Sequence, residues 1–345
     1  MKKLLYMAGA IALVACGSSK DTASADNDTT TDYSAKYAKT ITAKDLGKHL
    51  FIYASDEFEG RNTGEPGQKK AVKYLKDFYV SQGIASPLGG DDYFQEVPSE
   101  YLSSNRRGMT LKDSENVLAF IKGTEKPDEI IVISAHLDHE GIKNGEIYNG
   151  ADDDGSGTVA ILEIAEAFKQ AADAGKGPKR SILFLHVTGE EKGLLGSKYY
   201  TENPIFLLAN TVTNLNIDMI GRVDDRHKGN PNYVYLIGSD KLSTELHNIS
   251  EAMNKKYTNI DLDYKYNDDN DPNRFYYRSD HYNFAKHNIP IIFYFNGTHA
   301  DYHRPTDTPD KINYEMLENR ARLVFHTAWE VANRENRVVV DKAAN

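Results

Sequence analysis

Cysteine is almost absent from this 345-residue chain, which contains only Cys16. A single cysteine excludes an intramolecular disulfide and any metal site built from cysteine thiolates. No sequence repeat is visible, and no long apolar run follows the first residues. Basic residues are outnumbered, with 41 Lys and Arg against 51 Asp and Glu, so the net charge is −10. An acidic surface argues against nucleic acid as a partner.

The N-terminal residues have the pattern of a targeting signal. A basic start precedes an apolar stretch, residues 4–14, which is too short to span a bilayer. Residues 13–16 read LVAC and match a bacterial lipobox, whose cysteine is lipidated. We therefore expect a lipoprotein signal peptide at 1–15, a lipid anchor on Cys16, and a cell-envelope location on the periplasmic or surface side of a bacterial membrane. An ordinary secretory signal that contains a cysteine is the alternative.

The remaining sequence divides into two parts. Residues 16–40 are rich in Ser, Thr, Asp, Ala and Lys, so we expect a flexible tether. Residues 41–345 are long enough for one large core, and we expect a single domain there. The sequence leaves the oligomeric state open.

Apolar periodicity predicts alternating helices and strands. Helical patterns cover 41–59, 67–83, 156–170, 194–200, 242–257, 280–287 and 314–334. Strand patterns cover 116–122, 129–135, 181–187, 212–217, 233–237 and 289–295. Strands that are apolar throughout and alternate with amphipathic helices predict an α/β fold, a three-layer α/β/α sandwich around a mostly parallel mixed sheet. We expect residues 84–112 to form an edge connection over the sheet, and a ligand site beyond the carboxyl ends of the strands.

Two segments with metal-ligand character fall at such ends. In His136-x-Asp138 both side chains share one face of an extended strand, so His136 is a candidate ligand and Asp138 a residue that orients it or its surroundings. Residues 152–154 are three consecutive aspartates ahead of a helix. One aspartate satisfies a helix cap. Three aspartates flanked by glycines favour a bound cation.

A pair of glutamates follows the strand at 181–187. Adjacent carboxylates repel each other unless one is neutralised. We interpret Glu191 as a zinc ligand and Glu190 as a general base that takes a proton from the attacking water. Asp218 and His303, each at or after a further strand, are weaker candidates when taken alone.

Other histidines carry less signal. His281 follows Ser279 and Asp280, and we expect it behind the site rather than in it; a helix cap explains Ser279-Asp280 equally well. The remaining eight histidines are interpreted as surface or structural residues. Examples are His49, His139, His227 and His326.

These segments, in this order, resemble metallopeptidase family 28, the co-catalytic zinc aminopeptidases, over about residues 41–335. The motifs are Gly-Ala-Asp-Asp-Asp-Gly-Ser-Gly at 150–157, Gly-Glu-Glu-Lys-Gly-Leu-Leu-Gly-Ser at 189–197, and the Ser-Asp-His and His…Thr-Asp-Thr segments. The resemblance implies a zinc exopeptidase fold and two zinc ions that cleave peptide substrates.

The resemblance also implies a role for each position. Asp153 is the bridging carboxylate; His136 and Asp218 complete one zinc site. Glu191 and His303 complete the other. The general base is Glu190, and Asp138 is a partner of His136. A cis peptide bond is implied between Asp152 and Asp153.

Three other functions remain open beside an aminopeptidase. A glutaminyl cyclase resembles the same frame with a single zinc. A carboxypeptidase of acidic C-termini needs a basic cluster at its specificity pocket, for which Arg274, Arg278 and Arg304 are candidates. A non-catalytic binding lipoprotein of the same fold would need a dead site, against which the filled ligand positions speak. The ligand types also accept cobalt or manganese.

Overall fold

Eight strands form one sheet whose four central strands run parallel. The computed structural model describes residue 1 and residues 31–105 and 108–342. The strands are β1 (Phe94–Val97), β2 (Ser114–Ile121), β3 (Lys126–His136), β6 (Arg180–Val187), β7 (Thr211–Ile217), β8 (Tyr233–Ile237), β9 (Asp261–Asp263) and β10 (Ile291–Phe295). Their order is β1-β2-β6-β3-β7-β10-β8-β9, and β6, β3, β7 and β10 are mutually parallel. The antiparallel pairs are β1–β2, β2–β6 and β8–β10.

The central strands are apolar throughout because both of their faces are covered. In β3, Ile131 and Ile133 belong to one hydrophobic cluster, whereas Ile130 and Val132 belong to another. All eight residues of β6 are buried. Burial on both faces is typical of parallel strands enclosed by helices.

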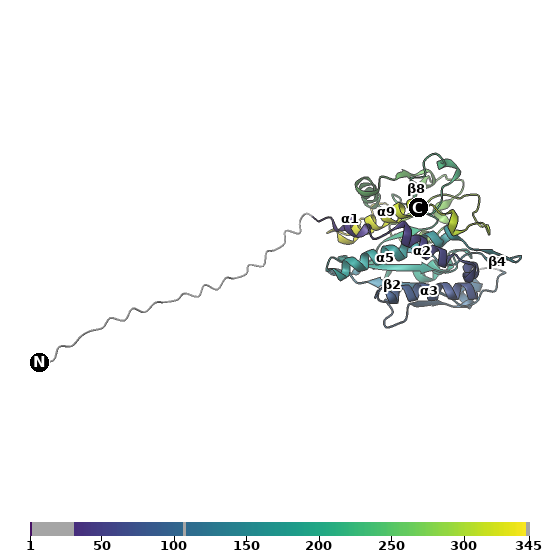
Figure 1. Cartoon of the computed structure of the whole chain (residues 1–345), viewed down its shortest axis with the longest axis horizontal. Coiled ribbons are helices and arrows are strands. Elements are labelled where there is room, and N and C mark those ends of the chain that lie inside the picture. Colours follow the sequence, from purple (N-terminus) through teal and green to yellow (C-terminus); the bar gives the residue numbers. More distant parts are fainter. Residues whose placement is uncertain (2–30, 106–107, 343–345) are drawn as a thin grey trace. The chain divides into compact units, whose positions relative to one another are not determined.

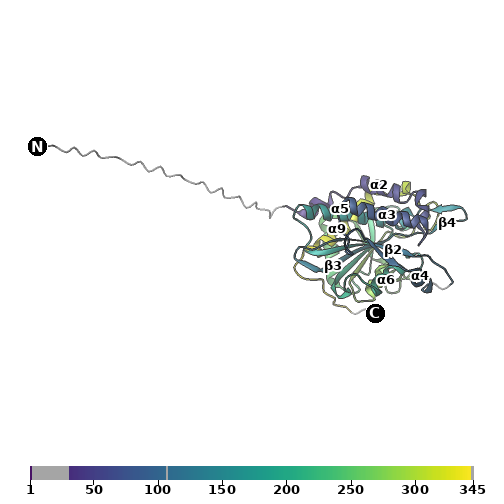
Figure 2. The same ribbon diagram turned by 90° about the horizontal axis from the view of Figure 1, so that it is seen from below.

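Helices cover the two faces of the sheet unequally, as Figures 1 and 2 show. One layer contains α1 (Tyr33–Ala38), α2 (Ala43–Tyr53), α3 (Pro66–Ser81), α5 (Gly157–Asp173), α7 (Thr244–Met253) and α9 (Tyr314–Asn333). The opposite layer contains the shorter helices α4 (Ser99–Ser104), α6 (Leu195–Glu202) and α8 (His281–Ala285). A separate hairpin, β4 (Gly141–Lys143) and β5 (Glu146–Tyr148), follows β3.

Helix α9 shows how the sequence defines these elements. The side chain of Asn313 accepts the amide of Met316 and so caps the first turn. Leu317, Ala321 and Val324 then recur at helical spacing and are fully buried against the sheet layer. The helix therefore begins at a cap and buries one apolar stripe.

The predicted three-layer sandwich is confirmed, and several segments contain short elements that periodicity did not predict. The expected tether 16–40 contains helix α1, whose Tyr37 packs on Trp329 of α9 at 6.0 Å between ring centroids. The connection at 84–112 contains β1 and α4, and β9 and the β4–β5 hairpin lack the length that periodicity can detect. Residues 2–30, with the expected signal peptide and Cys16, lie outside the described residues. No described helix is both long enough and apolar enough to cross a bilayer.

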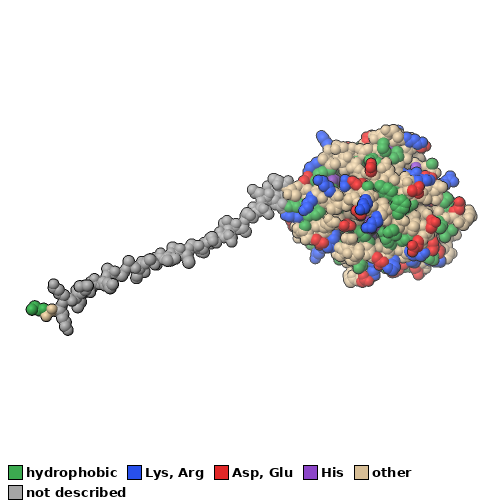
Figure 3. Space-filling model, in the orientation of Figure 1, with side chains coloured by type: hydrophobic (Ala, Val, Ile, Leu, Met, Phe, Trp, Pro, Cys, Tyr) green, Lys and Arg blue, Asp and Glu red, His purple; other side chains and the backbone are tan. Residues whose placement is uncertain are grey.

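Acidic and basic side chains are interspersed on the face drawn in Figure 3. Many described ion pairs are exposed, such as Lys73 with Asp77 on α3. Exposed pairs of this kind contribute little to stability, typically about 0.2–1 kcal/mol. The buried arginines differ, because each is surrounded by several hydrogen-bond acceptors.

Arg61 is the clearest example. Its side chain is 1% exposed and donates hydrogen bonds to four carbonyl oxygens, those of Tyr53, Leu137, Asn149 and Gly150, at 2.7–3.2 Å. The guanidinium also lies 4.7 Å above the ring of Tyr53. Arg61 therefore joins α2 to the end of β3 and to the turn that precedes α5.

We predict that Arg61→Met lowers the free energy of unfolding by about 3 kcal/mol, because it leaves buried carbonyls without donors. Urea denaturation followed by circular dichroism measures the loss. Lys73→Met on the exposed face of α3 is the matched control, with an expected change within about 0.5 kcal/mol. Equal effects of the two substitutions would contradict this role of Arg61.

Candidate active site

The carboxyl ends of the four parallel strands bring the predicted site residues together. Strand β3 ends at His136, and Asp218 directly follows β7. Glu190 and Glu191 lie three and four residues beyond the end of β6, and His303 lies in the loop after β10. Segments far apart in sequence therefore meet at one edge of the sheet.

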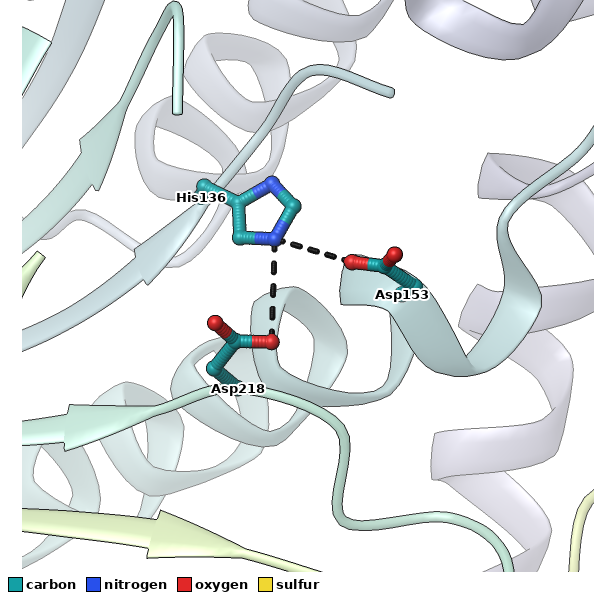
Figure 4. Close-up of side chains that lie close together, drawn as sticks. All are labelled: His136, Asp153 and Asp218. Carbon is teal, nitrogen blue, oxygen red and sulfur yellow. Dashed lines mark ion pairs between the residues drawn. The ribbon is translucent and has the colours of Figure 1, made fainter. Parts of the chain in front are cut away.

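His136, Asp153 and Asp218 form a first group, drawn in Figure 4. The Nε2 atom of His136 lies 3.1 Å from Oδ1 of Asp153 and 3.7 Å from Oδ1 of Asp218. Two ligand atoms on one tetrahedral zinc ion are about 3.4 Å apart, since each bond is about 2.0–2.2 Å. The Nδ1–H of His136 donates to the carbonyl of Asp138 at 2.9 Å, which turns Nε2 toward the two carboxylates.

A second group surrounds the other oxygen of Asp153. The Nε2 atom of His303 lies 2.9 Å from Oδ2 of Asp153 and 3.4 Å from Oε2 of Glu191. Oδ2 of Asp153 and Oε1 of Glu191 are buried, and neither has a hydrogen-bond partner in the described structure. Asp153 therefore faces both groups, as a bridging carboxylate must.

His139 belongs to the second group, although the sequence led us to expect a surface or structural residue. Its side chain is fully buried, and Nδ1 lies 2.9 Å from Oε1 of Glu191 and 3.7 Å from Oδ2 of Asp153. Neither ring nitrogen forms a hydrogen bond to the described residues. The only signal in the sequence was the position of His139 directly after His136-x-Asp138.

These orphaned atoms test whether the residues fit a metal. Four buried polar atoms lack hydrogen-bond partners among the described residues: both ring nitrogens of His139, Oδ2 of Asp153 and Oε1 of Glu191. These three side chains form one group whose ligand atoms lie within 4.8 Å of one another. Buried polar atoms are rarely left without a partner, because desolvation is costly. Imidazole nitrogens and carboxylate oxygens are ligands that zinc accepts. The donor set and its spacing therefore fit a bound divalent cation.

The three consecutive aspartates have different contacts. Asp153 points its carboxylate into the site, whereas Asp152 accepts the amide of Gly221 at 2.6 Å and the hydroxyl of Ser156 at 2.9 Å. The carboxylate of Asp154 accepts three amides, from His136, Gly157 and Met219, at 2.9–3.2 Å. One aspartate thus remains for a cation, and its two neighbours hold the backbone.

The cis peptide bond lies between Asp153 and Asp154, so the implied position between Asp152 and Asp153 is wrong by one bond. The amides of Asp152 and Asp153 both donate to Oδ2 of Asp307, at 3.0 and 3.2 Å. These two hydrogen bonds fix the backbone that precedes the side chain of Asp153.

Asp307 is a second residue whose role the sequence did not reveal. Besides those two amides, its backbone carbonyl accepts the amide of Ala151. Burial raises the pKa of Asp307 to about 6. Its position in the Thr306-Asp307-Thr308 segment was a signal for the family but not for this contact.

Asp138 acts on Glu190 as well as on His136. One carboxylate oxygen of Asp138 accepts the hydroxyl of Thr63 at 2.6 Å, and the other accepts the amide of Glu190 at 3.1 Å. That second oxygen is 3.9 Å from Nδ1 of His136, which instead bonds the carbonyl of Asp138. Asp138 thus fixes the backbone of Glu190.

Burial and neighbouring charges separate the protonation of the two glutamates. Burial raises the pKa of Glu190 well above its usual range. Burial and Asp153 also act to raise the pKa of Glu191, but the contacts with His139 and His303 outweigh them and lower it to about 2. Opposed by burial, contacts with His136, His139 and His303 hold the pKa of Asp153 well below its usual range. These shifts favour the anionic forms of Glu191 and Asp153, and they favour a proton on Glu190.

Asp280 and His281 lie behind the site. Asp280 is buried, accepts the hydroxyl of Ser197 at 2.5 Å, and has its pKa raised by burial to about 7. His281 donates from Nε2 to the carbonyl of Tyr276 and stacks on Phe293 at 4.6 Å. Neither side chain belongs to a group that could hold a metal.

Comparisons with known proteins agree with this arrangement. The family model for Peptidase family M28 matches residues 116–328. Leupeptin-inactivating enzyme 1 of Streptomyces exfoliatus is 28% identical over 303 residues, 81% of this chain and 59% of that enzyme. An aminopeptidase from Aneurinibacillus sp. strain AM-1 superposes with a TM-score of 0.64 at 18% identity, covering 90% of this chain and 98% of its own. BSAP, a zinc aminopeptidase from Bacillus subtilis, superposes with a TM-score of 0.64 at 17% identity, and the match covers 88% of this chain and 98% of BSAP.

At 17–18% sequence identity, the two solved structures show similarity of fold alone. The matched region spans 59% of the length of the leupeptin-inactivating enzyme. The family model covers more than half of the chain and includes all five residues that the sequence predicted as metal ligands, namely His136, Asp153, Glu191, Asp218 and His303. This chain belongs to Peptidase family M28.

Proposed function

We propose that this chain is a zinc-dependent aminopeptidase that holds two zinc ions bridged by Asp153. The observation that carries the proposal is the convergence of two ligand groups on the two oxygens of one buried carboxylate. His136 and Asp218 would hold one ion. Glu191 and His303 would hold the other, with His139 beside them.

Zinc bound there would supply Lewis-acid chemistry, polarising the scissile carbonyl and lowering the pKa of a water molecule. The protein's own contribution is proton transfer and positioning. Glu190 lines the same cavity as Asp153 and Asp218. Its carboxylate is placed to accept a proton from the attacking water and to return it to the departing amine. Asp138 holds the backbone of Glu190 in place during both transfers.

An exopeptidase that trims N-termini is favoured over the other activities. The cavity wall carries several carboxylates, which attract the cationic amino terminus of a peptide. Two relatives of similar fold are described as aminopeptidases, one of them as a zinc enzyme. Candidate ligand residues are present in both groups, which favours two zinc ions over the single ion of a glutaminyl cyclase.

Metal content tests the two-ion proposal. We expect mass spectrometry to find two zinc ions per chain. We expect Asp218→Asn to lower the affinity for the ion held by His136 and Asp218. His139→Ala should lower the affinity for the ion held by Glu191 and His303 about 10- to 100-fold, measured in competition with a chromophoric chelator. His287→Ala, an exposed histidine, is the matched control. Unchanged zinc affinity in His139→Ala would exclude His139 from the second site.

The proton-transfer role predicts a loss of turnover without a loss of metal. Glu190→Gln keeps the size of the side chain and the backbone contact with Asp138 but cannot accept a proton, so kcat should fall about 10²- to 10⁴-fold. Aminoacyl nitroanilides report the rate, and zinc content is measured on the same sample. Glu57→Gln, exposed and remote, should retain full activity. Pyroglutamate formation from glutaminyl peptides would reassign the activity to a cyclase.

We also propose that Cys16 carries a lipid and anchors the chain to a bacterial cell-envelope membrane, on the basis of the apolar stretch 4–14 and the LVAC sequence that follows it. The full chain should fractionate with membranes and incorporate labelled palmitate. Cys16→Ser should abolish both. Retention of label in Cys16→Ser would contradict the anchor.

A further inference from the structure

The cavity beside the metal groups is lined by both acidic and apolar side chains. The acidic ones are Asp153, Glu190 and Asp218, and the apolar ones include Met219, Phe275, Phe293 and Phe295. The cavity is open to solvent on one side, and its volume is about 30 Å³, room for a water molecule or a small group. The cavity reaches solvent at His303, whose side chain is 35% exposed, and at the exposed Arg278.

Arg278 is the only lysine or arginine among the described residues that line this cavity. Its guanidinium lies 4.8 Å over the ring of Phe275, within the range of a cation–π contact. No hydrogen bond or ion pair joins it to another described residue. The next residue, Ser279, donates to Oδ2 of Asp218 at 2.6 Å, so the backbone that carries Arg278 is tied to the first metal group.

Most other arginines of the described chain already have partners. Arg61 and Arg320 are buried and bond only carbonyl oxygens, and Arg222 pairs with Asp301 at 2.8 Å. Arg274 also lacks an acidic partner, but it stacks on Tyr277 and lines a different cavity. The guanidinium of Arg278 thus packs on Phe275 at this cavity, while its N–H donors have no hydrogen-bond or ion-pair partner among the described residues.

We propose that Arg278 binds a carboxylate of the substrate close to the scissile bond. The inference rests on the proposed peptidase function. A carboxylate near Asp153, Glu190 and Asp218 would otherwise meet like charges, and a planar guanidinium pairs with it through two hydrogen bonds. Two sources offer this group: the acidic side chain of the N-terminal residue, or the C-terminal carboxylate of a dipeptide. Arg278 therefore biases the enzyme toward acidic N-termini or toward dipeptides.

Matched substrate pairs test the inference and separate the two sources. Leucyl-alanine and leucyl-alaninamide differ only in the C-terminal carboxylate, and glutamyl and glutaminyl nitroanilides differ only in the side chain. For one pair, we expect Arg278→Gln to lower the ratio of kcat/KM for the carboxylate substrate to that for the neutral substrate by about tenfold. Kinetics on the neutral substrate should remain near wild type. Arg274→Gln is the matched control and should leave both ratios unchanged.

A binding measurement keeps this test independent of turnover. In the Glu190→Gln background, calorimetry with the same four compounds should show the same loss of discrimination when Arg278 is replaced. Turnover with unchanged ratios in Arg278→Gln would overturn the inference and leave the aminopeptidase standing. Discrimination in binding without any turnover in the parent chain would overturn the proposed function alone. Binding of none of the four compounds would overturn both.

Discussion

One buried carboxylate, that of Asp154, sets the spacing of the site. It accepts the amides of His136, Gly157 and Met219. These amides belong to the end of β3, the start of α5 and the residue after Asp218, so each lies in or beside a segment that supplies a metal-ligand candidate. Because three amides meet at one carboxylate, the segments cannot shift independently. The first metal group therefore depends on a residue that does not belong to it.

The glycines around the aspartates make this approach possible. A Cβ atom on Gly157 would lie 2.3 Å from Oδ1 of Asp154, and one on Gly221 would lie 2.8 Å from Oδ1 of Asp152. Either side chain would separate the carboxylate from the amide that it accepts. The Gly-Ser-Gly sequence after the aspartates thus serves close packing, in addition to the turn that its composition suggested.

The sequence predicted the long elements and the principal site residues for a physical reason. Strands such as β6 are apolar throughout because they are buried on both faces, and parallel strands bring their carboxyl ends to one edge. Short elements such as β9, three residues long, carry too little periodicity to be predicted. His139 and Asp307 were missed because their roles depend on contacts across long sequence separations. Such contacts leave no local pattern.

The density of carboxylates at the site links metal binding to the stability of the fold. Asp138 and Asp153 are buried and Glu190 and Glu191 are half-buried, and burial opposes the charged form of each. The described chain compensates in part with protons, since burial raises the pKa of Asp138 and Glu190, and in part with the imidazoles near Asp153 and Glu191.

Cations at the two groups would take over this compensation. Ligands must be deprotonated to bind a metal, so binding displaces protons that the folded chain otherwise needs. A cation that binds only the folded state also stabilises it in proportion to the logarithm of its concentration over the dissociation constant. The residues that would make the site reactive are thus the same residues whose burial destabilises the fold without metal, and bound cations would reduce that destabilisation.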